Sequence, residues 1–346
     1  MGQIVELIRL FGLTRLVRMK RRHDRALPIV RGYCTTVSLW ALFNTGVMDA
    51  LAGGAAASAA DLARTAGLDA RILGYVLDYL DGVRVLKCDA AGRYSLTGLG
   101  EVLVREPRGV FDLACGYEPV LNELTGLLKG EKRFGRDVTR RTAAVGRGEA
   151  ELGRQLPFVV LADEVKRGGF RTVLDLRCGH LEFLFTLCRV DPDVRGFGID
   201  ASPEAVEHAR ERLAASPFRD RVTVEHADFF DIDGLLEHRP DVDVMTAYDT
   251  FHEHLLEGTG KVETFLAHCH GKHPGVAMVV AEFCRQPHDR LRRRPTAFAE
   301  HHLWHNLTDQ VLLSADEWRT VFQRAGYRIE HERVFDIVGH GYFTLR

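Results

Sequence analysis

The sequence predicts an α/β domain in the C-terminal half of the chain, preceded by a mainly helical domain. Two observations predict this fold class. Beyond residue 170, three short apolar segments, each with an acidic residue in it or soon after it, alternate with stretches of helical apolar spacing. The first hundred residues instead contain three helical patterns followed by two short strand patterns around a turn. With 346 residues the chain is also long for a single hydrophobic core, so two domains are expected.

The composition is that of an ordinary globular protein. A formal net charge of −2 and a hydrophobic content of 46% give no electrostatic bias toward nucleic acid or a membrane surface. Seven cysteines show neither a disulfide framework nor metal-finger spacing, which suits a reducing compartment. No apolar run reaches the length of a membrane span, and the N-terminus lacks the features of a signal peptide. These observations predict a cytoplasmic protein with neither a membrane nor a nucleic acid as partner.

The N-terminal region begins with apolar helical spacing that carries a basic cluster over residues 15–25. We interpret this cluster as a solvated helix face, because the rest of the chain is not basic. Gly53 and Gly54 end a strongly apolar helix, and Ser58 begins the next one with capping-box spacing to Asp61. We expect helices over 33–51, from 58 onward and over 69–80. Two short strands are expected after them, over 83–88 and 92–97.

Three helices and a hairpin are typical of a winged helix, a module that often binds DNA. The helix over 69–80 would be the recognition helix. Its acidic residues outnumber its basic ones, so this face is not basic enough to bind phosphates. The charged residues considered are Asp69, Asp78, Asp81, Arg71 and Arg84. The sequence therefore argues against DNA as a partner, and the apolar helix over 33–51 fits a buried dimer interface instead.

Residues 102–150 have a mixed helical pattern, which the two glycines Gly146 and Gly148 weakly interrupt. We place the domain boundary there, which gives an N-terminal domain of residues 1–147 and a C-terminal domain of residues 148–346.

The strongest signal lies at residues 171–183, which read Arg-Thr-Val-Leu-Asp-Leu-Arg-Cys-Gly-His-Leu-Glu-Phe. A short apolar strand containing Asp175 is followed by a turn at Gly179, and helical spacing then begins. In an open α/β sheet, the turn between a strand and the following helix is where a nucleotide-like ligand binds.

The next two strands also lead into acidic residues. The second ends at Asp200, followed by Ala201 and a helix start, so this carboxylate is placed to hold the two hydroxyls of a ribose. The third strand, at 222–226, leads to Asp228 and Phe229. There the carboxylate could accept from an adenine amino group while the phenyl ring packs against the base.

This order of motifs resembles the S-adenosylmethionine (SAM) dependent methyltransferases. The stretch Tyr-Ser-Leu-Thr-Gly-Leu-Gly at 94–100 resembles the N-terminal dimerisation domain of the small-molecule O-methyltransferases of this class. The resemblance implies a Rossmann-like methyltransferase domain behind a winged-helix dimerisation domain, a homodimer, SAM as cofactor and a small-molecule acceptor. The implied SAM-binding residues are Asp175, Arg177, Gly179, Asp200, Ala201, Asp228 and Phe229.

The turn after the first strand departs from the resemblance. The family pattern is Gly-x-Gly-x-Gly, and its three positions hold Arg177, Gly179 and Leu181. Arg177 could pair with the SAM carboxylate, bend away, or mark a site with an altered ligand. The departure therefore keeps open a SAM-binding enzyme with a different reaction, such as cyclisation or elimination on SAM itself. A non-catalytic regulator built on the winged module is a further alternative.

Histidines supply the candidate catalytic groups. His252 and Glu253 follow the fourth strand, where O-methyltransferases commonly hold a His-Asp pair whose histidine acts as general base toward a hydroxyl. A second cluster follows the fifth strand, and the i, i+4 spacing of His301 and His305 is that of a metal-ligand pair on a helix.

A third interpretation joins the two clusters. The sequence is also similar to the 2-oxo-acid C-methyltransferases, including those acting on phenylpyruvate, which hold a metal with one histidine from each place. This similarity implies His252 and His305 as ligands of a divalent or ferric ion, with Glu253 as a further candidate ligand. His301 or His302 could take the place of His305. A Lewis acid on the keto oxygen would help form the nucleophilic enolate. Tyr117 and His301 are the candidate residues for contacting the substrate.

The basic run at residues 292–294 is interpreted as a solvated loop, with a clamp for an anionic substrate as the alternative. The sequence thus predicts a small-molecule methyltransferase. The reaction is either metal-assisted C-methylation of a 2-oxo acid or O-methylation with His252 as base.

Overall fold

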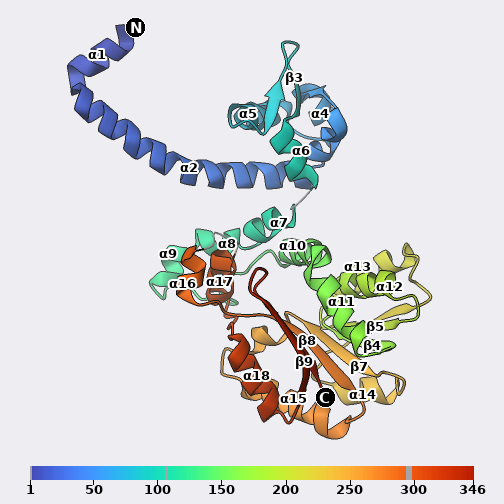
Figure 1. Cartoon of the computed structure of the whole chain (residues 1–346). Coiled ribbons are helices and arrows are strands. Elements are labelled where there is room, and N and C mark those ends of the chain that lie inside the picture. Colours follow the sequence, from blue (N-terminus) through green and yellow to red (C-terminus); the bar gives the residue numbers. More distant parts are fainter. Residues whose placement is uncertain (1, 106–107, 294–297) are drawn as a thin grey trace. The chain divides into compact units, whose positions relative to one another are not determined.

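The computed structural model describes residues 2–105, 108–293 and 298–346 (Figure 1). The chain divides into two compact units, Met1–Cys115 and Gly116–Arg346. By packing, residues 116–147 therefore belong to the second unit, while the functional boundary expected near residue 147 stays a prediction. Of the basic run at 292–294, residue 294 lies outside the described residues. The other two belong to a short helix rather than a loop, α16 (His288–Arg293).

The first unit begins with two largely exposed helices, α1 (Gly2–Phe11) and α2 (Leu13–Asn44). Helix α2 begins twenty residues before the expected helix at 33–51. It is followed at Gly46, in a left-handed conformation, by the separate short helix α3 (Val47–Ala50). Only Leu39, Leu42 and Phe43 of α2 are buried.

Helix α2 contains an 18-residue stretch with a mean hydropathy of 1.2, of which 17% is buried. By length and composition alone it could cross a bilayer, so the absence of a membrane partner stays a prediction.

The rest of the first unit is the expected set of helices and a small sheet. Ser58 accepts a hydrogen bond from the backbone N–H of Asp61 at the start of α4, and Asp69 caps α5 in the same way. A two-residue strand that the sequence did not predict, β1, extends the hairpin to a sheet with the order β1-β3-β2. The elements are η1 (Ala52–Gly54), β1 (Ala57–Ser58), α4 (Ala59–Ala66), α5 (Ala70–Gly82), β2 (Leu86–Cys88), β3 (Arg93–Leu96), α6 (Gly98–Arg105) and α7 (Gly109–Gly116).

The second unit is built on a seven-stranded sheet with the order β6-β5-β4-β7-β8-β10-β9 (Figure 1). The strands are β4 (Thr172–Leu176), β5 (Arg195–Asp200), β6 (Val222–His226), β7 (Val244–Tyr248), β8 (Ala277–Phe283), β9 (Ile329–Phe335) and β10 (His340–Leu345). The first five are parallel, and β10 is antiparallel to both of its neighbours. From β4 the chain builds outward through β5 to β6 and then returns to place β7 on the other side of β4. The strand order therefore reverses between β4 and β7, and a ligand crevice is expected at the carboxyl ends of these two strands.

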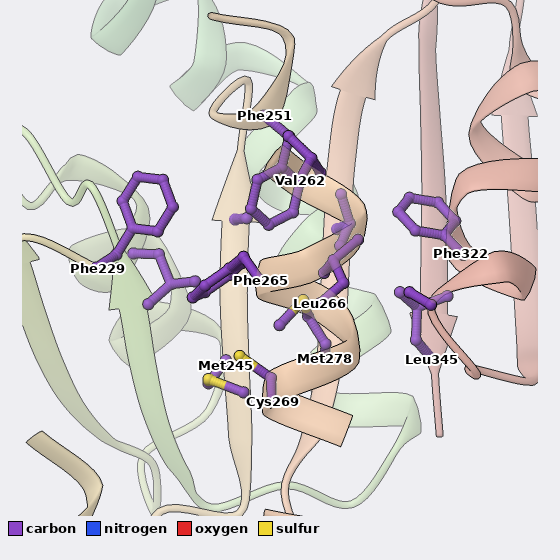
Figure 2. Packing of buried hydrophobic residues seen from close by; sticks show 14 of the residues in the cluster. Phe229, Met245, Phe251, Val262, Phe265, Leu266, Cys269, Met278, Phe322 and Leu345 are labelled. Atoms are coloured by element: carbon purple, nitrogen blue, oxygen red, sulfur yellow. The ribbon is translucent and has the colours of Figure 1, made fainter. Parts of the chain in front are cut away.

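Helices cover both faces of this sheet because its strands are apolar on both sides. On β4, Leu174 and Leu176 pack into one core cluster, while Val173 packs into the other. The first cluster is completed by α14 (Ile232–Glu237), α15 (Gly260–Lys272) and α18 (Ala315–Arg324). Figure 2 shows part of it, with Phe265 and Leu266 of α15 against Met245 and Met278 of the sheet. The second cluster involves α11 (Pro157–Arg167), α12 (Glu182–Val190) and α13 (Pro203–Ala214).

The remaining elements of the second unit carry residues of the candidate site. They are α8 (Glu118–Asn122), α9 (Leu124–Leu128), α10 (Thr142–Gln155), η2 (Phe251–His254) and α17 (Phe298–Leu307). Tyr117, just before α8, stacks on Trp304 of α17 with ring centroids 5.3 Å apart, which joins this region to the segment after β8.

The predicted fold class, an α/β domain behind a mainly helical domain, is therefore confirmed.

Candidate active site

The turn between β4 and α12 keeps the backbone form that the glycine pattern implies. Arg177, Gly179 and Leu181 have φ angles of 64°, 48° and 64°, so all three glycine positions are left-handed although two hold larger residues. A non-glycine residue pays roughly 1–2 kcal/mol for this conformation. The turn is held by bonds from the N–H of Cys178 to the carbonyl of Ile199 and from the N–H of Leu181 to the carbonyl of Cys178, at 2.8 and 2.9 Å.

Asp200, at the end of β5, ties this turn to the start of α13. Its carboxylate accepts hydrogen bonds from the N–H of Gly179 at 3.0 Å and of Ser202 at 2.9 Å. The carbonyl of the neighbouring Ala201 lies 3.1 Å from Nε2 of His226. A carboxylate at the end of the second strand, bonded to the glycine turn, is placed to accept hydrogen bonds from the hydroxyls of a ribose.

Asp228 and Phe229, the predicted adenine-binding residues, differ in their exposure to solvent. Asp228 is exposed, and its carboxylate accepts from the N–H of Phe230 at 3.0 Å. Phe229 is 6% exposed and packs against the rings of Phe230, Phe251 and Phe265 (Figure 2). Much of its ring is therefore already covered by protein, and its contact with adenine stays a prediction.

Asp175 lies inside the sheet rather than at its edge. The side chain is buried, and its Oδ1 accepts from the hydroxyl of Thr246 on β7 at 2.8 Å. Burial raises the pKa of this carboxyl to about 7, against the lowering effect of the Thr246 hydrogen bond, and the charge of nearby Asp200 raises it further. Asp175 is therefore partly protonated near neutral pH, and it supports the strand that leads into the turn.

Replacing Asp175 with Asn should flatten the pH dependence of stability. An aspartate in an unfolded chain titrates near pH ~4, so between that value and about 7 the folded protein holds an extra proton. The stability from this proton is complete at low pH and is lost as pH rises through the folded pKa. Asn keeps an acceptor for Thr246 but does not titrate, so the variant should gain stability relative to wild type from pH 5 to pH 8. Urea unfolding at both pH values measures this, and an unchanged difference between the two proteins would contradict a raised pKa.

His252 lies in η2, directly after β7, and is 2% exposed. Its Nδ1 donates to Oε2 of Glu282, at the end of β8, over 2.9 Å. The other oxygen of Glu282 accepts from the backbone N–H of Thr250 at 3.0 Å and of Phe251 at 2.6 Å. Burial lowers the pKa of His252 and the Glu282 carboxylate raises it, with the carboxylate prevailing. Glu282 thus holds both the backbone at the start of η2 and the ring of His252 in place.

His305, on α17, brings a second imidazole to the same place. The ring centroids of His252 and His305 are 5.1 Å apart. Nδ1 of His305 donates to the carbonyl of His301 at 2.7 Å, and burial lowers the pKa of His305 to about 3, so its ring is neutral. Both rings therefore commit Nδ1. Within the described part of the chain, Nε2 of neither ring has a hydrogen-bond partner. The ring of His301 itself stacks on Phe283, with centroids 5.2 Å apart.

Glu253, predicted to assist His252, contacts other groups. Its Oε1 accepts from Arg140 at 2.8 Å and from Gln310 at 2.5 Å, and its Oε2 lies 2.8 Å from Nη1 of Arg177. Burial raises the pKa of Glu253, but Arg177 and then Arg140 lower it to about 2, so the group is ionised. In the structure it is Glu282 that bonds the His252 ring, and a catalytic role of Glu253 stays a prediction.

Tyr117 also belongs to this charged cluster. It is 1% exposed, and its hydroxyl accepts from Nη1 of Arg140 at 3.2 Å. Together with Trp304 it forms an aromatic wall next to the two histidines, because its ring centroid is 6.4 Å from that of His305. The location therefore suits a predicted substrate-contacting residue.

Asp249 and Glu282 are two carboxylates that lie close to His252. Asp249, His252 and Glu282 place ligand atoms within 4.8 Å of one another. However, Asp249 already bonds Nε2 of His340 at 2.9 Å and the N–H of Phe283 at 2.8 Å, and both oxygens of Glu282 are occupied. These acids therefore position their neighbours, while among the described residues Nε2 of His252 and of His305 remains without a hydrogen-bond partner.

Sequence reasoning missed three residues of this arrangement: Glu282, Arg140 and Gln310. Glu282 carried a usable signal, because it is an acid at the end of an otherwise apolar strand, as Asp200 is. Arg140 and Gln310 lie in segments without a motif, and no signal in the sequence identified them.

Comparisons with known proteins identify both domains of the chain. The O-methyltransferase dimerisation domain matches residues 27–106, and a methyltransferase domain matches residues 171–326. The match to the dimerisation domain includes the C-terminal half of α2, which supports a homodimer in which a second copy of the chain packs against this exposed helix.

Two curated proteins are similar over nearly the whole chain. The 3-amino-4-hydroxybenzoate 4-O-methyltransferase of Streptomyces cremeus is 26% identical over 345 residues, covering 91% of this chain and 88% of that protein. The 2-ketoarginine methyltransferase of Streptomyces arginensis is 27% identical over 315 residues, covering 90% of each.

Solved structures show the same fold. Mitomycin 7-O-methyltransferase aligns with a TM-score of 0.71 and 18% identity, covering 96% of this chain and 99% of that one. A methyltransferase of calicheamicin biosynthesis, solved with S-adenosylhomocysteine (SAH) bound, aligns with a TM-score of 0.61 and 20% identity over 96% and 98% of the two chains. With both domains matched in order, the chain belongs to the SAM-dependent methyltransferases of the two-domain O-methyltransferase type.

Proposed function

We propose that this enzyme transfers the methyl group of SAM to carbon 3 of a 2-oxo acid with the help of a metal ion held by His252 and His305. One observation carries the proposal. Two buried imidazoles, 5.1 Å apart between ring centroids, each donate Nδ1–H to a fixed acceptor and leave Nε2 without a partner in the described chain. Donation of the second ring nitrogen to a carboxylate or carbonyl is the usual environment of a metal-ligating histidine.

The donor set fits a transition-metal ion. Imidazole nitrogen suits zinc, copper, iron and nickel, and two protein ligands leave positions for a chelating substrate. The low pKa of His305 keeps its ring available as a lone-pair donor at neutral pH. When bound, a divalent or ferric ion would supply Lewis-acid polarisation of the keto group, which makes the neighbouring C–H more acidic.

The reaction then balances as a simple displacement. The C–H bond at carbon 3 breaks, its proton passes to solvent water, and the electron pair of that bond forms the new bond to the methyl carbon of SAM. The electrons of the broken sulfur–methyl bond return to sulfur, which leaves SAH. The chain's own part is to position the acceptor in line with the methyl group, with Arg140 and the Tyr117–Trp304 wall as its nearest groups.

Two features of the chain support a 2-oxo acid. Arg140 places a guanidinium beside the Tyr117–Trp304 wall, which favours an anionic acceptor. One of the similar proteins is named for a 2-keto acid substrate. The turn also keeps a left-handed backbone at all three glycine positions, which supports methyl transfer over a different reaction on SAM.

The second candidate is O-methylation of a hydroxyl with His252 as general base. The Glu282–His252 pair favours it, because a carboxylate on Nδ1 orients the ring and raises the basicity of Nε2. The curated relative from Streptomyces cremeus is named as a 4-O-methyltransferase. This alternative leaves the neutral, pre-oriented His305 ring without a function.

The experiment is product analysis with metal analysis on the same protein preparation. The enzyme is incubated with SAM labelled in the methyl group and with either phenylpyruvate or a phenolic acid, and the product is examined by NMR. A methyl doublet coupled to the proton on carbon 3, with about one metal ion per chain and loss of activity on chelation, is the expected result. A methoxy singlet from the phenolic acid, unaffected by chelation, would establish the second candidate instead.

A further inference from the structure

Arg177 places a guanidinium at the carboxyl edge of the sheet, at a position where the glycine pattern supplies no side chain. Its Nη1 lies 2.8 Å from Oε2 of Glu253 and 3.2 Å from the carbonyl oxygen of Asp249. Its Nε and Nη2 have no acceptor among the described residues, although only 31% of the side chain is exposed. These two nitrogens form the flat edge of a guanidinium that matches the two oxygens of a carboxylate.

The charge around Arg177 also favours an anion. Two guanidiniums, Arg140 and Arg177, share the single carboxylate of Glu253, and both of its oxygens are already occupied by hydrogen-bond donors. One positive charge in this trio is therefore not compensated within it. Glu149 on α10 also lies near both arginines, and burial raises its pKa against their lowering effect.

We propose that the free edge of Arg177 binds the carboxylate of the methionine part of SAM. The acceptor is the other source of a carboxylate in the proposed function. The cofactor is favoured because Arg177 belongs to the turn between β4 and α12, between Asp175 and Gly179, where the backbone is shaped for the cofactor. The inference rests on the proposed function only in that SAM is the methyl donor.

This contact joins the two substrates of the enzyme. With Nη1 bonded to Glu253 and the opposite edge on SAM, Arg177 links the cofactor to the cluster that contains Arg140 and Tyr117. The side chain leaves the backbone of the turn towards η2, so the turn keeps its left-handed form and gains a charged contact. Arg177 is thus a cofactor-binding residue specific to this chain's version of the turn.

The test is calorimetric titration with three ligands that differ in the amino-acid part. SAH carries the carboxylate, while 5′-methylthioadenosine and decarboxylated SAM lack it. Arg177→Gly should weaken SAH binding by about ten- to a hundredfold, the range for a hydrogen bond to a charged group. The other two ligands should bind wild type and variant within about twofold. Glycine accepts the φ of 64° at this position, so the variant should fold.

Two further variants sharpen the result. Arg177→Lys keeps the charge without the fork and should recover part of the lost affinity, while Arg210→Ala on the exposed face of α13 should leave all three affinities unchanged. An equal loss for all three ligands would mean a damaged turn and would overturn the proposal. Unchanged SAH binding in Arg177→Gly would show that Arg177 does not bind the cofactor carboxylate and would also overturn the proposal. No acceptor is used in the titrations, so failure of the C-methylation proposal leaves this test intact.

Discussion

Replacing His305 with Ala should reduce methyl transfer to a 2-oxo acid by at least about a thousandfold and should remove the bound metal. Loss of one of two protein ligands eliminates the Lewis acid on which enolisation depends, and contributions of this type are large. The ring is 7% exposed and packs against the rings of His252, Tyr117 and Phe283. The rate constant kcat and the metal content of dialysed protein measure both effects.

The same substitution separates the two candidate functions. With His252 acting as a base on a hydroxyl, His305 is a neighbour 5.1 Å away, and its removal should change kcat only severalfold. A matched control is His268→Ala, which removes an exposed histidine paired with Asp233 and should leave kcat and metal content unchanged. Full activity in a folded His305→Ala variant would disprove the metal site.

Replacing Glu282 with Ala should lower the free energy of unfolding by about 3–5 kcal/mol, the range for breaking a buried charge pair. The side chain is fully buried and bonds His252 through one oxygen and two backbone N–H groups through the other. Alanine would leave these donors in the core without an acceptor, at about 1–3 kcal/mol for each. Urea denaturation measures the change.

Glu282→Gln isolates the chemical role from the structural one. Its amide oxygen can still accept from Thr250 and Phe251, so much of the stability should be retained. Its NH₂ group would face Nδ1 of His252 and donate to it, which moves the ring proton to Nε2 and blocks that atom as a ligand or base. Activity should therefore fall by at least about 10–100-fold, as for other residues that orient a metal ligand. A stable Glu282→Gln variant with normal activity would show that the tautomer of His252 is unimportant.

Much of the fold could be predicted from local patterns. The alternation of Val173, Leu174 and Leu176 between two cores is a period-two pattern, and glycine turns mark where strands end. The length of α2 could not be predicted in this way, because its N-terminal half is exposed and its apolar residues face no core within the chain. The two-residue strand β1 depends on pairing with Tyr94 and Arg93 in β3, and such pairing leaves no periodic trace.

The candidate site could be predicted only where its residues follow strands. His252 and Asp200 were located because the carboxyl ends of parallel strands meet at one edge of the sheet. The closeness of His305 to His252 depends on how α17 folds back after β8, which no spacing in the sequence encodes. Arg140 reaches Glu253 from 113 residues away in the chain, so its contribution required the three-dimensional structure.

The left-handed turn at Arg177, Gly179 and Leu181 has a consequence for recognising such enzymes. Leu181 is fully buried in the second core cluster, and burying a leucine contributes about 1.5–3 kcal/mol, enough to offset the dihedral strain of its position. Glycine adopts a positive φ without steric cost, whereas here the buried side chain of Leu181 stabilises the same backbone conformation. A search for the letters of the glycine pattern would reject this chain, whereas a search for three positive dihedral angles at alternate residues would accept it.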